Sequence, residues 1–533
     1  DHSAGAVARF LPGGYKLCSV TMNDELVDFP TVESKKLFRS TRYLGFDLNG
    51  VTNSRQLAPD LIYETGDHAR ILPMNDTSVV LAMCDCLGLQ PGQWVHVMIE
   101  DGPAFPTPTM RIGDLLALEV DLATQQDDGN LTLLNRLLQI ARLSDNTSVE
   151  SRDELARLEL TTETLEDAGD LAKVKAEKAT KAARELRQSV KREMSMSPIF
   201  EDDVNDATGS SVSAPSEVLV REEGKKRAVA SITEKYLTIP ALLNQFPIAL
   251  SNLTLADCIE TLPRLKPRHY SIASSSEMCP TKLQLSVAKL TITHKSTGKD
   301  RNGLCSHFLA STECSTHDYV NLGKCDVFCA NTKCFVRLGL TRSTFRLPKD
   351  YGAPIIMIGP GTGIAPMLGF LEAREKAFSN GMKLGSCMVF FGCRAENDYL
   401  HKERMRSWAE MGVISDLQVA FSRLPGRNKE YVQDVVARHR DAVWAMLSDP
   451  NCHYYICGDS KMAEDVFGEL KTTAKTAGGL DHIDSVQFFR KMKTERRYQA
   501  DTWGVVPPKK LVEKKYNQAE AWLKNFDEKI EEE

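Results

Sequence analysis

Apolar residues form three short continuous runs in the last third of the chain, and segments with helical spacing separate them. The runs begin at Ile355, Cys387 and Cys452. A continuous apolar run of this length is typical of a strand that is buried on both faces. Strands that alternate with helices predict a parallel sheet. We therefore expect residues 349–506 to form a doubly wound parallel-sheet domain.

Two earlier blocks are rich in strand-like runs that are broken by turn residues. The first covers residues 1–105, with a run at Arg42–Leu48 and a turn at Tyr63–His68. The second covers residues 263–348. Short strands bounded by turns are typical of an antiparallel sheet. We expect the two blocks to be parts of one antiparallel β-barrel, so the fold class is all-β followed by α/β.

Residues 106–262 interrupt this barrel with a helical insertion. Apolar residues recur at helical spacing around 131–143, and a helical pattern resumes at 232–261. Between them, residues 171–187 are rich in Ala, Lys, Glu and Arg, and residues 201–216 are polar and acidic. The segment 170–225 is therefore expected to hold an exposed charged helix and a flexible linker.

A last amphipathic helix is expected at residues 507–533, after Pro507 and Pro508. Its apolar positions recur every three or four residues, at Val512, Tyr516, Ala519, Leu523, Phe526 and Ile530. Such a stripe is expected either to dock on the chain's own surface or to bind a partner in a larger assembly.

Composition and charge narrow the class of protein. Of 533 residues, 42% are hydrophobic and 26% are charged, as in a globular protein. The net charge of −6 argues against general nucleic-acid binding. No apolar run is long enough to span a bilayer, and no signal peptide is recognisable. We expect a cytoplasmic protein, or an organellar one if the start at Asp1 reflects a removed targeting segment.

Cysteines raise the question of a metal site. The chain has 14, including Cys84 and Cys86 and a group of four between 314 and 334. Neither group has zinc-finger or ferredoxin spacing. Because several lie among apolar residues, we expect buried thiols and no metal.

Polar clusters follow each of the three C-terminal apolar runs. Gly359, Gly361, Thr362 and Gly363 follow the first run, and the glycines are expected to let the backbone approach an anion at a helix start. The second run ends in Cys393 and Arg394, and the third in Cys457, Gly458 and Asp459. Since ligands bind beyond the carboxyl ends of parallel strands, these clusters predict a dinucleotide site.

Two motifs of the second β-rich block resemble those of the FAD- and NADPH-binding half of the diflavin reductases. Arg268-His-Tyr-Ser271 resembles the flavin motif, which implies that Arg268 contacts the FAD pyrophosphate, Tyr270 packs on the isoalloxazine and Ser271 lies near its reactive nitrogen. The second motif resembles a pyrophosphate-binding helix start, and it comprises Gly303, Leu304, Cys305 and Ser306. A guanidinium suits a diphosphate because it donates a bidentate fork.

The resemblance also covers the reader of the NADP 2′-phosphate. It implies this role for Ser422, Arg423, Lys429, Tyr431 and Gln433. The last three alternate, so on a strand they would share one face. Cations and hydroxyl donors suit a phosphate, whereas NAD sites place an acid against the ribose.

Five residues together resemble the family's hydride-transfer site. They are Ser271, Cys457, Asp459, Asp501 and Trp503. The resemblance implies that Trp503 covers the flavin and moves aside for the nicotinamide, while the others orient and support the transfer.

The function implied is that of an FAD-dependent NADPH oxidoreductase, which passes single electrons to a flavodoxin-like FMN domain or another redox acceptor. The family's FMN domain would precede this region, but only about fifteen residues do, far fewer than a domain needs. Two alternatives stay open: a structural or regulatory subunit that retains the fold, and an NADPH oxidase or diaphorase without a dedicated partner.

Overall fold

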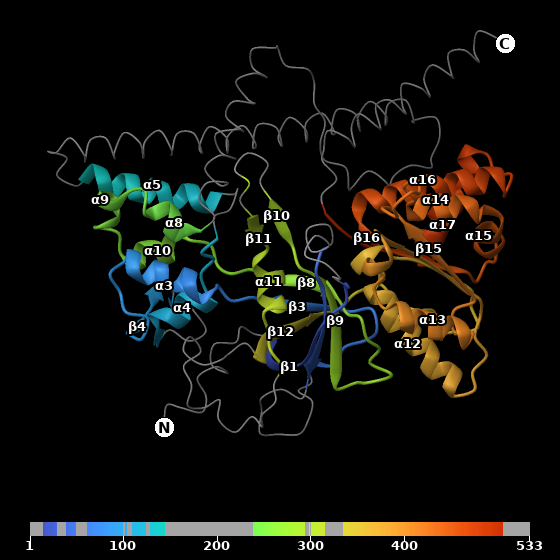
Figure 1. The fold of residues 1–533 in the computed structure, drawn as a ribbon, viewed down its shortest axis with the longest axis horizontal. Coiled ribbons are helices and arrows are strands. Elements are labelled where there is room, and N and C mark those ends of the chain that lie inside the picture. Colours follow the sequence, from blue (N-terminus) through green and yellow to red (C-terminus); the bar gives the residue numbers. More distant parts are fainter. Residues whose placement is uncertain are drawn as a thin grey trace, which may run out of the picture.

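The computed structural model describes residues 14–28, 39–48, 61–99, 102–103, 109–123, 128–143, 238–293, 298, 300–314 and 334–504. Within them, a helical part, an antiparallel sheet and an α/β part lie in a row, with the antiparallel sheet in the middle (Figure 1). The expected charged helix and linker at 170–225 and the expected C-terminal helix lie outside the described residues.

The antiparallel sheet contains strands from both β-rich blocks, as expected. Its six strands run in the order β8-β3-β12-β1-β2-β9. Ile272, directly after the edge strand β8, forms an isolated bridge to Leu285 in the other edge strand. The two edges of the sheet therefore meet at this point. The strands are β1 (Tyr15–Glu25), β2 (Thr41–Asp47), β3 (His68–Leu72), β8 (Arg268–Ser271), β9 (Lys282–Ala288) and β12 (Phe335–Thr341).

A short hairpin and helix connect β9 to β12. The hairpin pairs β10 (Thr291–Thr293) with β11 (Asp300–Asn302), and α11 (Leu304–Ala310) follows it directly. Cys305 and Leu309 of this helix pack into the same core as Val20, Leu44 and Ile71. This packing fixes the start of α11 against the sheet.

The helical part has its own core and begins earlier than the sequence predicted. Val80 and Met83 of α3 (Thr77–Cys86) pack with Leu116, Leu133 and Leu243. The first part of the antiparallel sheet therefore ends at Leu72 rather than near residue 105. The β-branched residues after Asp76 favour a strand locally, but the Asp76 carboxylate accepts from the backbone N–H of Ser78 at 2.8 Å and caps a helix.

Apart from α5, the remaining elements of the helical part are short. The helices are α4 (Ile112–Leu118), α5 (Asp128–Leu143), α8 (Ile239–Leu243), α9 (Pro247–Leu250) and α10 (Leu255–Thr261). Two small ribbons pair β4 (Trp94–His96) with β7 (Thr109–Arg111), and β5 (Met98–Ile99) with β6 (Gly102–Pro103).

The α/β part contains the expected parallel sheet. Its five strands run in the order β15-β14-β13-β16-β17, and every neighbouring pair is parallel. The three apolar runs form the central strands, which are buried on both faces as their composition predicts. The strands are β13 (Ile355–Ile358), β14 (Cys387–Cys393), β15 (Asp416–Phe421), β16 (His453–Asp459) and β17 (Tyr498–Trp503).

Helices cover both faces of this sheet. One core packs Met357 and Val389 against α12 (Ala365–Ser379) and α13 (Lys402–Glu410). A second core packs Ile356 and Phe390 against the helices of the opposite face. These helices are α14 (Val432–Arg438), α15 (Arg440–Leu447), α16 (Ser460–Thr476) and α17 (His482–Thr494).

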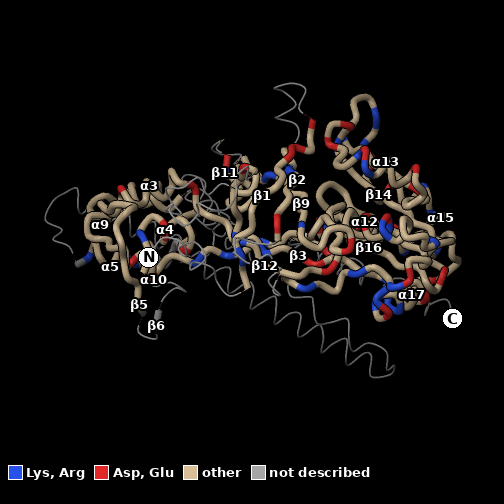
Figure 2. Tube along the Cα trace, turned by 90° about the horizontal axis from the view of Figure 1, so that it is seen from below, with Lys and Arg blue, Asp and Glu red and all other residues tan. Residues whose placement is uncertain are grey.

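Charged residues of both signs are interspersed along the trace (Figure 2). Within the described ranges, no helix is long and apolar enough to cross a membrane.

Candidate active site

The carboxylate of Asp501 is the centre of a hydrogen-bonded cluster between the two sheets. Ser271, at the end of β8, donates its hydroxyl to Asp501 Oδ2 at 2.6 Å. The Cys457 thiol, on β16, donates to the same oxygen at 3.7 Å. His68, at the start of β3, places its Nε2 3.0 Å from both carboxylate oxygens. The structure thus brings together three of the five residues expected at the hydride-transfer site.

The three donors keep Asp501 ionised. Burial by itself would raise the pKa of Asp501, but the hydrogen bonds from His68, Ser271 and Cys457 and the charge of His68 outweigh it, so that its pKa lies below the ordinary value. The hydrogen bond to Asp501 raises the pKa of His68 against the opposing effect of burial. Burial, together with the nearby Asp501 charge, raises the pKa of Cys457 well above its usual range. At neutral pH the site therefore holds a carboxylate and a protonated thiol.

The histidine was missed by the sequence analysis. It is the last residue of the segment Tyr63–His68, which was recognised only as a break between strands. Asp67 is fully buried there and accepts from the Arg342 guanidinium at 2.9 Å and from the backbone N–H of Ser343 at 3.0 Å. The sequence shows an acid next to a histidine but not that the acid is buried, and nothing nearby in the sequence pointed to Asp501.

Trp503 and Asp459 lie side by side at the carboxyl edge of the parallel sheet. They are paired in register between β17 and β16. The Trp503 side chain is 44% exposed, so a large apolar surface faces the solvent here. One oxygen of Asp459 accepts from the backbone N–H groups of Lys461 and Met462, which caps α16. Asp459 thus has a structural task at the position where a catalytic role was expected.

Two of the three glycines in the turn after β13 are needed for a different reason from the expected approach of an anion. A Cβ at Gly363 would lie 2.2 Å from the Cys457 carbonyl oxygen, and one at Gly359 would lie 2.6 Å from the Gly363 carbonyl oxygen. These two glycines are required because the chain packs against itself. Gly361 alone has open space around it, and its φ of +56° favours glycine. Gly361 and the adjacent, half-buried Thr362 begin the 3₁₀ turn η5 (Gly361–Ile364), which leads into α12.

The residues expected to hold the FAD pyrophosphate fit a compact turn. A Cβ at Gly303 would lie 2.9 Å from the Ser306 hydroxyl and 3.1 Å from the Leu290 Cβ. The Ser306 hydroxyl accepts from the backbone N–H of Leu290 at 3.0 Å and donates to the Gly303 carbonyl at 3.1 Å. Ser306 therefore builds the turn, and Gly303 leaves the start of α11 without a side-chain cap.

Arg268 and Tyr270 flank this turn on β8. Arg268 is half-buried and donates to the Lys266 carbonyl at 2.6 Å, so its cation is held close to the sheet. Burial raises the pKa of Tyr270 well above its usual range, and the nearby Cys305 thiol adds to this effect. These contacts keep Tyr270 as a neutral aromatic ring beside Ser271. A cation, a close-packed glycine turn and a neutral ring together are suited to a diphosphate flavin.

Cationic residues gather beyond the carboxyl ends of β14 and β15. Arg394 directly follows Cys393, and Arg423 follows Ser422. The backbone N–H of Arg423 donates to the Arg394 carbonyl at 2.7 Å. Burial lowers the pKa of Arg394, and repulsion from Arg423 and Arg39 adds to this while Asp398 opposes it. This edge of the sheet is therefore suited to an anionic group.

The expectation that Lys429, Tyr431 and Gln433 share one face of a strand is wrong. β15 ends at Phe421, and α14 begins at Val432, so Gln433 lies in a helix. The Asp434 carboxylate accepts from the backbone N–H of Tyr431 at 2.8 Å, which starts the helix there. Lys429 and Tyr431 remain exposed in the loop between β15 and α14, which also contains Arg423.

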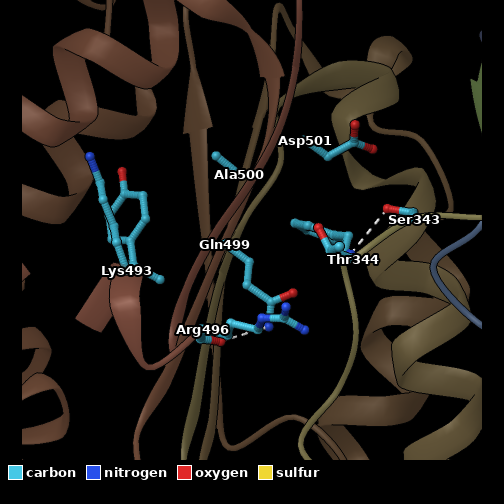
Figure 3. Close-up of a pocket in the computed structure, with 9 residues that line it drawn as sticks. Ser343, Thr344, Lys493, Arg496, Gln499, Ala500 and Asp501 are labelled. Atoms are coloured by element: carbon cyan, nitrogen blue, oxygen red, sulfur yellow. Dashed lines mark hydrogen bonds between the residues drawn. The ribbon is translucent and has the colours of Figure 1, made fainter. Parts of the chain in front are cut away.

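A pocket of about 360 Å³ borders the site along the free edge of β17. Figure 3 shows Asp501 at one end of it and Arg496 and Gln499 at the other, with Ser343 and Thr344 opposite the strand. The Gln499 amide donates to the Arg346 carbonyl at 2.9 Å, so the strand and the connecting loop are joined at this pocket.

Comparisons with known proteins agree with this geometry. The family model for an FAD binding domain matches residues 205–308, and that for an oxidoreductase NAD-binding domain matches residues 357–467. The chain is similar to the NADPH–cytochrome P450 reductase of Drosophila melanogaster, with 36% identity over 247 residues, which cover 46% of this chain and 34% of that protein. It is also similar to the inducible nitric oxide synthase of Sus scrofa, with 38% identity over 275 residues, which cover 51% of this chain and 22% of that protein.

A third relative is the NADPH–cytochrome P450 reductase of Rattus norvegicus, with 33% identity over 283 residues, which cover 53% of this chain and 39% of that protein. The chain thus spans between one fifth and two fifths of the length of these relatives. The two matched domains define an FAD- and NAD(P)-binding oxidoreductase unit. The chain carries the FAD/NADPH module of the diflavin reductase family.

Proposed function

We propose that this chain is an FAD-dependent NADPH oxidoreductase that accepts a hydride from NADPH and passes single electrons to a redox acceptor. The observation that carries the proposal is that the Ser271 hydroxyl and the Cys457 thiol both donate to the Asp501 carboxylate. One of these residues comes from the antiparallel sheet and two come from the parallel sheet. A site whose residues come from both sheets is suited to bringing together two cofactors, one bound to each part of the chain.

The two cofactors, when bound, supply the redox chemistry, in which a hydride moves from the nicotinamide to the flavin. The protein's task is to hold the reacting groups in contact and to favour the charge that develops on the nicotinamide. Ser271 and Cys457 orient the Asp501 carboxylate, whose negative charge would favour the positive charge that develops on a bound nicotinamide. Arg268 and the turn at Gly303 would hold the flavin diphosphate, and Arg394, Arg423 and Lys429 would face the 2′-phosphate.

The acceptor is proposed as a flavodoxin-like FMN domain or another one-electron carrier. This part of the proposal is supported by the names of the relatives, two of which are reductases of a cytochrome P450. We also propose that the bridge between Ile272 and Leu285 closes the antiparallel sheet into the flavin-binding barrel.

Cofactor release and anaerobic reduction test the proposed function. The purified chain is expected to release FAD in about equal molar amount, and its flavin absorbance should bleach on addition of NADPH under argon. The matched control is Asp501→Asn, which keeps the shape of the side chain but removes its charge; it should retain FAD and bleach more slowly, by about a hundredfold. A chain that binds FAD but is not reduced by NADPH would instead fit a structural or regulatory subunit.

A further inference from the structure

The contact between His68 and Asp501 joins the two sheets at the proposed hydride-transfer site. His68 opens β3 of the antiparallel sheet, and Asp501 lies in β17 of the parallel sheet. Both side chains are mostly buried, with 20% and 18% of their surface exposed. The Nε2 atom lies 3.0 Å from each carboxylate oxygen, so one ring nitrogen faces the whole carboxylate.

We propose that His68 is a positioning residue for hydride transfer, and that its protonation sets the net charge of the carboxylate cluster beside the nicotinamide. This inference rests on the proposed function. His68 would hold Asp501 against Ser271 and Cys457, and would act on the reaction only through that carboxylate.

The backbone that carries His68 is fixed. Gly66, two residues before it, has a φ of +97°, and a Cβ there would lie 2.0 Å from the Phe345 carbonyl oxygen. The next residue, Asp67, is fully buried and bound to Arg342 and Arg346. The backbone that carries the imidazole is therefore held in place opposite Asp501, which is a property that a positioning residue needs.

Several charged groups face His68 from the elements packed around it. The hydrogen bond and the charge of Asp501 raise the pKa of His68, burial lowers it, Asp67 raises it and Arg346 from the connecting loop lowers it. Burial lowers the pKa of His269 on β8, and the charge of His68 lowers it further. The Cys457 thiol, on β16, stays protonated because its pKa is raised by burial. Among these groups, only the two histidines ordinarily change charge near neutral pH; the pKa of His68 is raised and that of His269 is lowered, and only His68 contacts Asp501.

The hydrogen bond survives the loss of the proton, but the charge does not. A neutral imidazole can still donate from Nε2 to Asp501 if its other nitrogen carries no proton. Below the pKa of His68 the pair is neutral overall, and above it the pair carries one negative charge. Since hydride donation leaves the nicotinamide positively charged, the uncompensated carboxylate favours the transfer. Hydride transfer should therefore become faster as the pH rises through the pKa of His68.

Two substitutions separate position from charge. The amide nitrogen of His68→Gln can replace Nε2 as a donor, but glutamine does not titrate. His68→Leu removes both the donor and the charge. If the proposal holds, the flavin of the glutamine variant is reduced at every pH at the rate that the parent reaches only above the pKa of His68. The leucine variant is expected to be slower by about tenfold or more, with an unchanged Michaelis constant for NADPH.

The experiment combines two measurements on the full chain with its bound FAD. The first follows the His68 ring nitrogens by NMR between about pH 5 and 9, with Asp501→Asn as the control, and requires no turnover. Titration above the ordinary histidine value, with a fall in the asparagine variant, is expected. The second follows anaerobic flavin reduction by NADPH in a stopped-flow instrument over the same range, for the parent and both variants.

The outcomes are distinct. A step in the parent's rate at the NMR pKa of His68, which is lost in His68→Gln, supports the proposal. The same pH profile in the parent and in His68→Gln overturns it, as does a His68 pKa that ignores Asp501. If the parent's flavin is not reduced by NADPH, the proposed function fails, while the NMR titration still decides whether Asp501 controls His68.

Discussion

At the scale of single residues, Asp501 shows how a carboxylate can stay ionised although it is mostly buried. A buried carboxylate usually takes up a proton, because the interior solvates its charge poorly. Here a hydroxyl, an imidazole and a thiol donate to it and outweigh burial. The side chain is thus held both in place and in its charged form.

This pair should make stability depend on pH. The folded pKa of Asp501 is lowered, so its contribution is present above the unfolded value of about 3.9 and is lost as the pH falls through the folded pKa. The folded pKa of His68 is raised, so its contribution is present below about 6.5 and is lost as the pH rises through the folded pKa. The free energy of unfolding of the parent should exceed that of His68→Gln most between about pH 4 and 6.5. Urea titrations at several pH values measure this, and a difference that is constant with pH would contradict it.

Nucleotide preference is also a residue-scale property. Arg423 and Lys429 are exposed beyond β15, where they would meet the 2′-phosphate that distinguishes NADPH from NADH. Replacing both by alanine should raise the Michaelis constant for NADPH by about a hundredfold, because two charge-assisted contacts are lost. The constant for NADH should hardly change. Lys383→Ala, at the amino end of the sheet, is the control and should alter neither; equal losses for both nucleotides would assign Arg423 and Lys429 a structural role.

At the scale of elements, the glycine-rich turn after β13 is determined by its packing against β16. The chain passes so close to the Cys457 carbonyl that position 363 has no room for a methyl group. Position 361, two residues earlier, faces open space. The two glycines thus serve different purposes in one turn.

Alanine substitutions at these positions should separate the two purposes. Gly363→Ala should lower the free energy of unfolding by more than about 2 kcal/mol, because the backbone of β16 must shift. Gly361→Ala should cost only about 1 kcal/mol, the strain of a left-handed backbone. Urea unfolding compares the two variants. Equal losses of unfolding free energy in the two variants would show that the backbone of β16 near Cys457 shifts readily to make room for a methyl group.

The sequence predicted elements well where one local rule determined them. Three strands were recognised because burial on both faces requires a continuous apolar run. The helix α3 was missed because its β-branched residues favour a strand, whereas the cap by Asp76 starts a helix. The loop at Lys429 was taken for a strand because polar residues alternate there, and the cap by Asp434 that starts α14 was not recognised. His68 was missed because 433 residues separate it from Asp501. Local patterns carry no information on a partner so distant in the sequence.

At the scale of the whole molecule, two charged clusters fix the antiparallel sheet against the α/β part. In one, the buried Asp67 binds Arg342 and Arg346 in the connecting loop. In the other, the Glu372 carboxylate on α12 accepts from the backbone N–H of Ser275 at 2.7 Å and from Arg404 at 2.5 Å. Because the proposed site needs residues from both sheets, these clusters set its geometry from a distance.

Asp67→Asn tests the first cluster. Loss of the buried charge should lower the free energy of unfolding by about 2 kcal/mol, since bonds to two guanidinium groups weaken together. The matched control is Glu64→Gln. Glu64 meets the same two arginines, but its side chain is 65% exposed, so the cost should stay below about 1 kcal/mol. Equal costs in urea unfolding would mean that burial of Asp67 adds nothing.

The burial of Cys457 has a consequence for how the whole molecule tolerates oxidants. Alkylating agents and peroxides attack the thiolate, and burial keeps this sulfur protonated. Eight of the twelve cysteines in the described ranges are buried, and Cys314 alone among these twelve is exposed. An oxidant would therefore modify the exposed thiol of Cys314 before the buried thiol of Cys457. Iodoacetamide should label Cys314 rapidly and spare Cys457 in the native chain. Labelling of Cys457 would therefore be a marker of unfolding.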